Sequence, residues 1–174
     1  MADNIREDFK PDELEWKDEE EKSLRDFMTG AFSRNAFEVL APRQFEESLR
    51  NNTPLTLVVI DLNDFKAVND TLGHPEGDRR MTMFAKDLQN KLRDQDYFFR
   101  YGGDEFVLLM HSTDSQVAES KVLPKINNSL KLANLNAAIG FAGRVPEDTL
   151  ETLLGRADQL MYKNKDEFRS KKNV

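Results

Sequence analysis

The sequence predicts an α+β domain, in which helices pack against a largely antiparallel sheet. Short apolar runs bounded by turn residues alternate along the chain with longer segments whose apolar residues recur every three or four positions. Two of the short runs flank a Gly-Gly-Asp-Glu sequence, as the strands of a hairpin do. The 174 residues, 39% apolar and 33% charged, suit one domain with a modest core.

Four short runs have the character of strands. The run LTLVVI is rich in β-branched residues and lies between polar turns, which is typical of a buried strand. Gly102 and Gly103 join the two runs of the hairpin, and we expect positive φ angles there. The strands are expected at residues 55–60, 97–101, 106–110 and 136–142.

Four longer segments have the apolar spacing of helices. Pro42 interrupts the pattern of the first, and Pro124 is expected to break the third, because proline cannot donate a main-chain hydrogen bond. The second is expected to begin near Gly77, with Asp78 as its cap. The helices are expected at residues 34–50, from residue 77 onward, and at residues 115–133 and 146–165.

Charge is unevenly distributed between the two ends of the chain. Residues 1–26 carry 11 acidic and 5 basic side chains, whereas residues 163–174 carry 5 basic and 2 acidic ones. Residues 12–27 contain strong helix formers but few apolar positions, which indicates either a solvated helix leading into the domain or a flexible acidic tail. We therefore expect an acidic helix or linker over residues 1–25 and one domain over residues 26–174.

The composition excludes several classes of protein and of site. No run reaches the ~20 consecutive apolar residues of a membrane-spanning helix, and the N-terminus lacks the basic and then apolar order of a signal peptide. The absence of cysteine excludes disulfides and thiolate metal sites, and it suits a cytoplasmic location. The net charge of -7 opposes binding to DNA or RNA, but it allows a small anionic ligand in a local basic pocket.

Acidic residues follow one predicted strand and occupy the hairpin turn. Asp61 ends the strand LTLVVI, and Asp104 and Glu105 lie in the turn. If the two strands are neighbours, three carboxylates converge; the alternative is that each acid is an ordinary solvated turn residue. Gly102 and Gly103 favour convergence, because they let a phosphate approach the main chain, and a triphosphate among carboxylates requires a cation such as Mg²⁺. Such a site suits nucleotidyl transfer.

Four blocks of the sequence, in order and at matching spacing, resemble the GGDEF family of diguanylate cyclases. They are residues 26–34 (DFMTGAFSR), residues 61–78 (DLNDFKAVND, then GH and GD), residues 100–106 (RYGGDEF) and residues 157–169 (AD, YKNK and the final arginine). The resemblance extends over roughly residues 26–169. It implies a central, mostly antiparallel five-stranded sheet flanked by helices, which is the palm-like architecture of nucleotide cyclases.

The resemblance also implies an activity. A diguanylate cyclase condenses two GTP molecules into cyclic di-GMP and releases two pyrophosphates, with the help of Mg²⁺ or Mn²⁺. One chain holds one GTP, so a transient antiparallel homodimer must bring each ribose 3′-hydroxyl to the α-phosphate of the other nucleotide. Residues 12–27 are then either an element that sets this dimer or a linker from a longer protein.

The family's catalytic residues match positions of this chain. By resemblance, Asp61, Asp104 and the main-chain carbonyl of Leu62 would hold the metal ions. Glu105 would complete the acidic group and be essential for catalysis. All four are present in this sequence, so the resemblance implies an active enzyme rather than a degenerate one.

The family's substrate-binding residues are matched as well. Asn69 and Asp78 would bind the edge of the guanine base, and a carboxylate there accepts from donors that adenine does not present, which favours GTP over ATP. His74 matches a position near the base. Lys165 and Arg169 match a phosphate-binding tail, a role that suits their charge. Lys66 and Lys163 are expected to be ordinary lysines on helix surfaces.

A further pair matches the family's product-inhibition site. Arg93 and Asp96 form an R-x-x-D pattern just before the hairpin, where they would hold cyclic di-GMP as a feedback inhibitor. The sequence departs from the family pattern at Phe168, which stands where a glycine usually precedes the tail arginine. No predicted metal or guanine ligand is missing.

Two alternative functions remain open at this point. The same pocket would also suit a regulatory module that binds GTP or cyclic di-GMP without catalysis, although intact Asp61, Asp104 and Glu105 argue against it. A relative of polymerase palm domains that makes a different cyclic nucleotide from ATP is the second alternative, and Asp78 argues against that. Turnover and nucleotide competition discriminate among the three.

Overall fold

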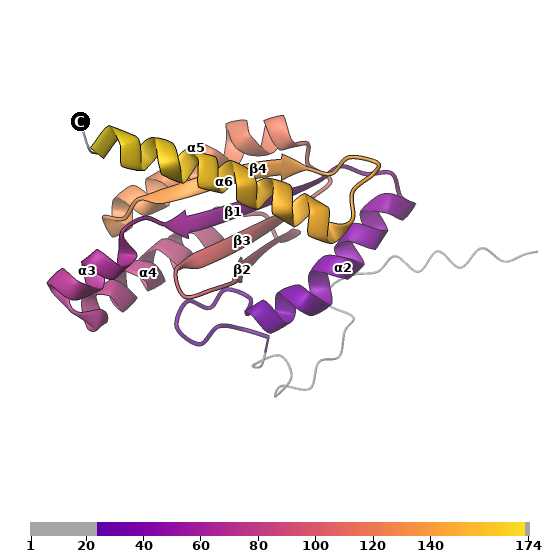
Figure 1. The fold of residues 1–174 in the computed structure, drawn as a ribbon. Helices are drawn as coiled ribbons and strands as arrows, with labels where there is room; N and C mark the ends of the chain where they lie inside the picture. Colours follow the sequence, from indigo (N-terminus) through magenta and orange to yellow (C-terminus); the bar gives the residue numbers. More distant parts are fainter. Residues whose placement is uncertain (1–23, 173–174) are drawn as a thin grey trace, which may run out of the picture.

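The computed structural model of the chain describes residues 24–172. Over these residues the helices lie around one central sheet, as expected for an α+β domain (Figure 1). In chain order the elements are α2 (Arg34–Arg50), β1 (Leu55–Leu62), α3 (Phe65–Leu72), α4 (His74–Gln89), β2 (Asp96–Arg100), β3 (Glu105–His111), α5 (Ser115–Ala133), β4 (Ala137–Gly143) and α6 (Leu150–Lys172).

The sheet is antiparallel throughout, with the strand order β2-β3-β1-β4. It has four strands within the described residues, so the expectation of five is wrong. Beyond β2, a single residue extends the sheet: Phe32 donates its main-chain N–H to Phe98 at 2.8 Å and accepts from Arg100 at 2.7 Å. The next residue, Ser33, already caps α2 through its side chain. The chain therefore leaves the sheet edge before a strand can form.

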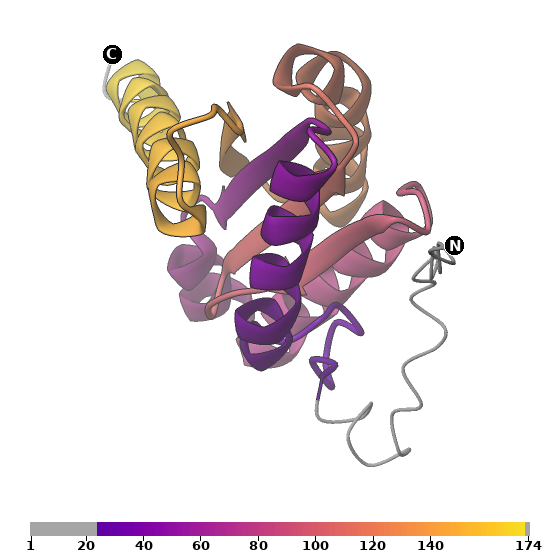
Figure 2. The same ribbon diagram turned by 90° about the vertical axis from the view of Figure 1, so that its right-hand side faces the viewer.

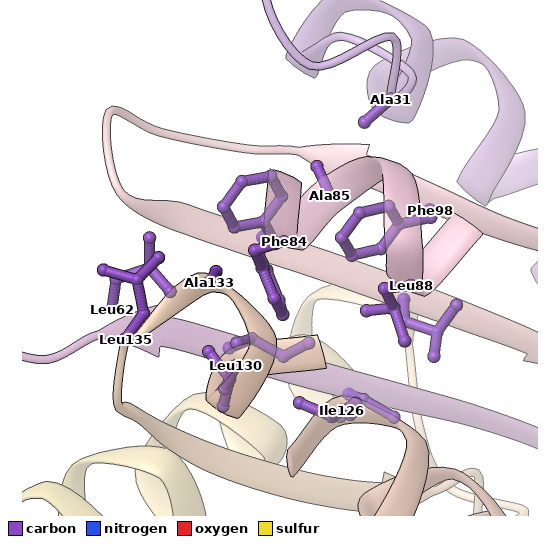
Figure 3. Packing of buried hydrophobic residues seen from close by; sticks show 14 of the residues in the cluster. Ala31, Leu62, Phe84, Ala85, Leu88, Phe98, Ile126, Leu130, Ala133 and Leu135 are labelled. Carbon is purple, nitrogen blue, oxygen red and sulfur yellow. The ribbon is translucent and has the colours of Figure 1, made fainter. Parts of the chain in front are cut away.

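The two faces of the sheet are covered by different helices. Alternate residues of β1 point to opposite faces, and all eight are buried, as expected for a central strand between two layers. Leu57 and Val59 pack with α2 and α6, whereas Val58 and Ile60 pack with α4 and α5. Figures 1 and 2 show these helices on the two sides of the sheet. Figure 3 shows the second of these layers, where side chains of α4 and α5 meet those of the sheet.

The β4 strand is an edge strand, and α6 packs closely over it. A Cβ on Gly140 would lie 2.1 Å from the carbonyl oxygen of Ala157 and 2.4 Å from the main-chain nitrogen of Met161. Only glycine at position 140 therefore lets the helix approach this far. At the outer side of β4, the N–H of Ile139 donates a 3.4 Å hydrogen bond to the side chain of Asn164 in α6.

Pro124 does not break its helix, which corrects the prediction, and Pro42 lies within a helix whose bounds were expected. Pro42 lies within α2 and Pro124 within α5, and both helices are continuous. Both prolines are exposed, so the carbonyl groups that lose a main-chain donor can be hydrated instead.

The region before α4 also differs from the prediction. A separate helix, α3, follows β1, and α4 begins at His74 with Pro75 in its first turn, so Asp78 lies inside the helix and does not cap it. Gly73, with φ of 83°, joins the two helices. Among the described glycines, Gly30 and Gly73 have positive φ angles. Gly102 and Gly103 do not, which corrects the expectation for the hairpin turn.

The predicted acidic helix over residues 12–27 lies mostly outside the described residues. Its last part is not helical, because Arg25 pairs with Phe32 in an isolated bridge and the following residues form a turn. Over the described part of the chain, no helix combines the length and apolar character needed to cross a membrane.

Candidate active site

The two acidic stretches meet at one end of the sheet. Asp61, near the end of β1, is the antiparallel partner of Glu105, the first residue of β3. One residue further, the main-chain N–H of Leu62 donates a 3.0 Å hydrogen bond to the carbonyl oxygen of Asp104. The register of two neighbouring strands thus brings together the acids that the sequence singled out.

The two glycines of the hairpin turn have different surroundings. A Cβ on Gly102 would lie 2.6 Å from Oε2 of Glu105, so the absence of a side chain makes room for that carboxylate. A Cβ on Gly103 would meet nothing within 4 Å. The carbonyl oxygen of Gly103 instead accepts hydrogen bonds from Nε and Nη2 of Arg100, at 3.2 and 2.8 Å. Gly102 therefore shapes the acidic site, and Gly103 is held by the preceding strand.

Arg100 also joins this turn to the N-terminal turn (residues 26–32). Its Nη1 lies 3.2 Å from both carboxylate oxygens of Asp26, and both side chains are 15% exposed. Asp26 also accepts from the main-chain N–H and the hydroxyl of Thr29. Burial alone raises the pKa of Asp26, but the bonds from Thr29 and the charge of Arg100 outweigh it and hold the pKa below its usual value. Through Arg100, this network of hydrogen bonds holds the Gly-Gly turn against the N-terminal turn.

The carboxylates at the site influence one another. Burial raises the pKa of Glu105, and the negative charges of Asp61, Asp104 and Asp158 raise it further, whereas Lys165 opposes the shift. Burial and the charge of Asp61 likewise raise the pKa of Asp158, a residue of α6. Four carboxyl groups from three elements and a turn therefore share one electrostatic environment, and such coupled groups are typical of functional sites.

The cation of this environment comes from α6. Nζ of Lys165 donates a 2.7 Å hydrogen bond to Oδ1 of Asp61, and the side chains are 19% and 8% exposed. The position of this ammonium depends on how closely α6 packs on β4, which Gly140 permits. A long-range contact between β1 and α6 thus offsets part of the negative charge of the acidic site.

A cavity of about 170 Å³ opens beside Asp104. It is lined by the end of β1, the start of α3 and the far end of α6. Lys66, Lys165 and Arg169 add positive charge to its lining, which suits an anionic ligand bound with cations. The lining residues are Leu62, Asn63, Asp64, Phe65, Lys66, Asp104, Lys165, Phe168 and Arg169.

The predicted metal ligands offer hard oxygen atoms but no preformed cage. Asp61, Asp104 and the carbonyl of Leu62 provide the kind of donors that Mg²⁺ and Mn²⁺ prefer. Within residues 24–172, however, no group of three acidic or histidine side chains is arranged to hold a metal ion by itself. The donor set fits a divalent ion that takes its remaining ligands from a bound nucleotide or water, as Mg²⁺ commonly does.

Comparison with known proteins places this geometry in a family. Residues 23–171 match the diguanylate cyclase GGDEF domain. The chain belongs to the GGDEF family. It is 34% identical over 160 residues to the probable diguanylate cyclase DgcC of Escherichia coli K12, which covers 87% of this chain and 43% of that protein. The chain therefore spans less than half the length of this curated relative.

Solved structures show the same fold. The diguanylate cyclase SiaD of Pseudomonas aeruginosa, in complex with its activator SiaC, has a TM-score of 0.78 and 30% identity, covering 83% of this chain and 59% of that one. The GGDEF domain of DgcB from Caulobacter crescentus, in complex with c-di-GMP, has a TM-score of 0.77 and 25% identity, covering 83% of this chain and 88% of that one.

The predicted guanine ligands of the GGDEF domain lie on the two helices after β1. Asn69 is on α3, and His74 and Asp78 are exposed on the first turns of α4. The helices touch where Gly77 faces Asn69: a Cβ there would lie 1.8 Å from Oδ1 of Asn69. This oxygen is buried without a hydrogen-bond partner in the protein, so it retains the capacity to accept a bond. The base-binding roles of these residues stay predictions.

The predicted product-binding pair lies at the other end of the hairpin. Asp96 begins β2 and is the partner of Met110, away from the Gly-Gly turn. The main-chain N–H of Arg93 donates a 3.1 Å hydrogen bond to Oδ2 of Asp96, and the Arg93 side chain is exposed. The structure brings this pair together in one turn, and its role in binding product stays a prediction.

Two residues of the site escape sequence reasoning. Asn63 is 6% exposed, lines the cavity, and has both polar atoms of its amide buried without a hydrogen-bond partner in the protein. Asp158, on α6, lies near enough to Asp61 for that charge to raise its pKa. The signal for Asn63 was its place directly after a buried strand, between two aspartates. Asp158 lies seven positions before Lys165, which places both on one face of a helix.

Proposed function

We propose that this domain is a diguanylate cyclase that joins two GTP molecules into cyclic di-GMP and releases two pyrophosphates. The observation that carries the proposal is the convergence of Asp61 with Asp104 and Glu105 at one end of the sheet. Membership of the GGDEF family supports the choice of reaction over other uses of such an acidic site.

The acidic residues would hold the divalent cation of the reaction. Asp61, Asp104 and the main-chain carbonyl of Leu62 are the proposed ligands. A bound Mg²⁺ or Mn²⁺ would neutralise charge on the α-phosphate and lower the pKa of the attacking 3′-hydroxyl. In the metal-free protein, burial and neighbouring carboxylates raise the pKa of Glu105. A bound cation would counteract this shift. Glu105 is proposed to complete the acidic group at the reacting hydroxyl.

The rest of the site would bind and orient GTP. Lys165 and Arg169, which line the cavity, are proposed to bind the triphosphate. Asn69 and Asp78 are proposed to bind the guanine edge, where a carboxylate discriminates against adenine by leaving unpaired groups with the wrong base. The open space at Gly103 leaves room for a phosphate beside the main chain.

Two copies of the domain would cooperate in each round. One nucleotide per chain requires an antiparallel homodimer in which the two sites face each other. If dimers form by chance contacts, specific activity rises with protein concentration, whereas a constant specific activity would contradict transient dimerisation. Cyclic di-GMP bound at Arg93 and Asp96 would inhibit the enzyme.

The decisive experiment incubates purified protein with GTP and either Mg²⁺ or Mn²⁺ and identifies the products by chromatography. Cyclic di-GMP and pyrophosphate are expected, and a Glu105→Ala variant of equal foldedness should make neither. GTP binding without product would establish a binding module instead. If ATP competed with GTP at concentrations similar to those of GTP, the guanine-binding role of Asp78 would be contradicted.

A further inference from the structure

Lys165 makes a contact that its predicted phosphate-binding role does not require. Its ammonium lies 2.7 Å from Oδ1 of Asp61, the carboxylate proposed to hold the metal. The Asp61 side chain is 8% exposed, so solvent offers this charge little screening and a nearby cation stabilises it strongly. Lys165 therefore compensates the negative charge of Asp61 in this structure, as a bound divalent cation would.

The surroundings of Asp61 show why the ammonium occupies this place. Asp61 and Asp104 both raise the pKa of Glu105, and Asp61 raises that of Asp158, so negative charge is concentrated here. Lys165 alone opposes the shift at Glu105. The two exposed cationic residues that line the same cavity, Lys66 and Arg169, have no ion pair with Asp61 among the described contacts.

The two partners of Asp61 exclude each other. A divalent ion coordinated by the Asp61 carboxylate at about 2.1 Å would stand within a few ångströms of the ammonium, and like charges at that distance repel strongly in a site with little solvent. The lysine stem is flexible, however, and the cavity that Lys165 lines opens beside it. A triphosphate in that cavity would offer the ammonium a second anion.

We propose that Lys165 is the counterion of Asp61 in the nucleotide-free protein and keeps divalent cations off that carboxylate until a triphosphate draws the ammonium away. The inference rests on the proposed function. It makes metal binding and nucleotide binding mutually reinforcing, because each favours the same displaced position of Lys165. The nucleotide-free domain then resists loading with metal, and the two ligands arrive as a coupled pair.

The test measures Mn²⁺ binding to the whole chain by the electron paramagnetic resonance signal of free Mn²⁺. Titrations are made without nucleotide and with a GTP analogue whose α,β-methylene bridge prevents cyclisation. The variants are Lys165→Met, the matched control Lys66→Met, which removes a charge from the same cavity, and the double variant Asp61→Asn with Lys165→Met.

Lys165→Met should bind Mn²⁺ without nucleotide about 5- to 150-fold more tightly than wild type, the range of ordinary coupling between sites. The analogue should tighten Mn²⁺ binding to wild type much more than to Lys165→Met. Without nucleotide, Lys66→Met should bind Mn²⁺ as wild type does, and the double variant should lose the gain because Asp61 is the ligand that was freed. Equal nucleotide-free affinities for wild type and Lys165→Met would overturn the proposal.

Folding is checked in parallel, because Lys165→Met leaves a buried carboxylate without its partner. Lys165→Gln, which keeps a hydrogen-bond donor, serves if the methionine variant unfolds, and Mn²⁺ should raise its melting temperature more than that of wild type. Cyclic di-GMP synthesis by wild type with no gain in Mn²⁺ affinity in the variants would reject this inference alone. A gain in affinity without any product would reject the proposed function alone.

Discussion

Two carboxyl groups with a raised pKa lie at opposite ends of the β2–β3 hairpin. Glu105 follows the Gly-Gly turn, and Asp96 begins β2; burial is the largest cause of the shift at both. The charges around them differ in sign. Three other carboxylates raise the pKa of Glu105 further, whereas Arg93 and Lys125 counteract the effect of burial on Asp96.

The difference shows how the two ends are assembled. Asp96 is held by the main chain of its own turn, through the N–H of Arg93. Glu105 belongs to a group of acids that comes from β1, the hairpin turn and α6, and its balancing cation is a lysine near the end of the chain. One end is held by hydrogen bonding within its own turn, and the other is assembled only when the whole domain is folded.

The largest expected effect tests whether the turn end performs chemistry. Glu105→Gln should reduce cyclic di-GMP formation by about 100-fold or more, because the variant cannot accept a proton or carry the charge of the acidic group. Chromatographic product formation per mole of folded protein is the measurement. Glu46→Gln, at an exposed position of α2, is the matched control and should keep full activity. A Glu105→Gln variant within tenfold of wild type would remove Glu105 from the mechanism.

The second prediction tests the dependence of the site on α6. Gly140→Ala should lower the free energy of unfolding by about 1–3 kcal/mol, because the new methyl group overlaps the main chain of α6. Cyclase activity should fall as well, since the helix that carries Lys165 must shift. Gly155→Ala is the control: it lies within α6, its Cβ meets nothing within 4 Å, and alanine favours a helix by about 1 kcal/mol. Equal urea midpoints for the two variants would contradict the close contact.

The third prediction concerns pH. Because the pKa of Glu105 is raised above its ordinary 4.5, the folded protein binds this proton more readily than the unfolded chain, and Glu105 lowers stability as pH rises through that window. Glu105→Gln should therefore gain stability relative to wild type from about pH 4.5 upward, with little difference in more acidic solution. Urea unfolding at a series of pH values measures the gain. A gain that shrinks with rising pH would contradict the direction of the shift.

The smallest structural effect is expected at the local end. Arg93→Ala should change the free energy of unfolding by no more than about 0.5 kcal/mol, because the Arg93 side chain is exposed. It should nevertheless weaken inhibition by added cyclic di-GMP and raise product accumulation. Arg43→Ala, another exposed arginine, should leave inhibition unchanged. Undiminished inhibition of Arg93→Ala would show that product binds elsewhere.

Local patterns predicted most of the elements. The run LTLVVI predicted β1. The antiparallel pairing of β1 with β3 confirms that Asp61 and Glu105 lie side by side. The α3–α4 junction was missed because its sharp reversal depends on the backbone of Gly73 and on the contact between Gly77 and Asn69. The fifth strand was expected from family resemblance, but at the β2 edge Phe32 makes only an isolated bridge to Phe99.

Long-range contacts were the least predictable part of the site. The pairing of Lys165 with Asp61 depends on how closely α6 approaches β4, which a composition or spacing argument does not contain. The same holds for Asp158, whose acidic side chain resembles an ordinary helix-surface residue until the fold places it near Asp61. The chemistry of the acids could be predicted from their sequence, but their counterion could not.

The position of α6 over the free flank of β4 has a consequence for truncated forms of the protein. An uncovered edge strand presents unpaired N–H and C=O groups that can recruit a strand from another molecule. Without α6, the N–H of Ile139 would lose its bond to Asn164, and Ala138 and Ala142 would lose their apolar cover. A fragment ending before α6 should therefore aggregate through this flank, so shortening the chain at its C-terminus would remove solubility together with the site's cations.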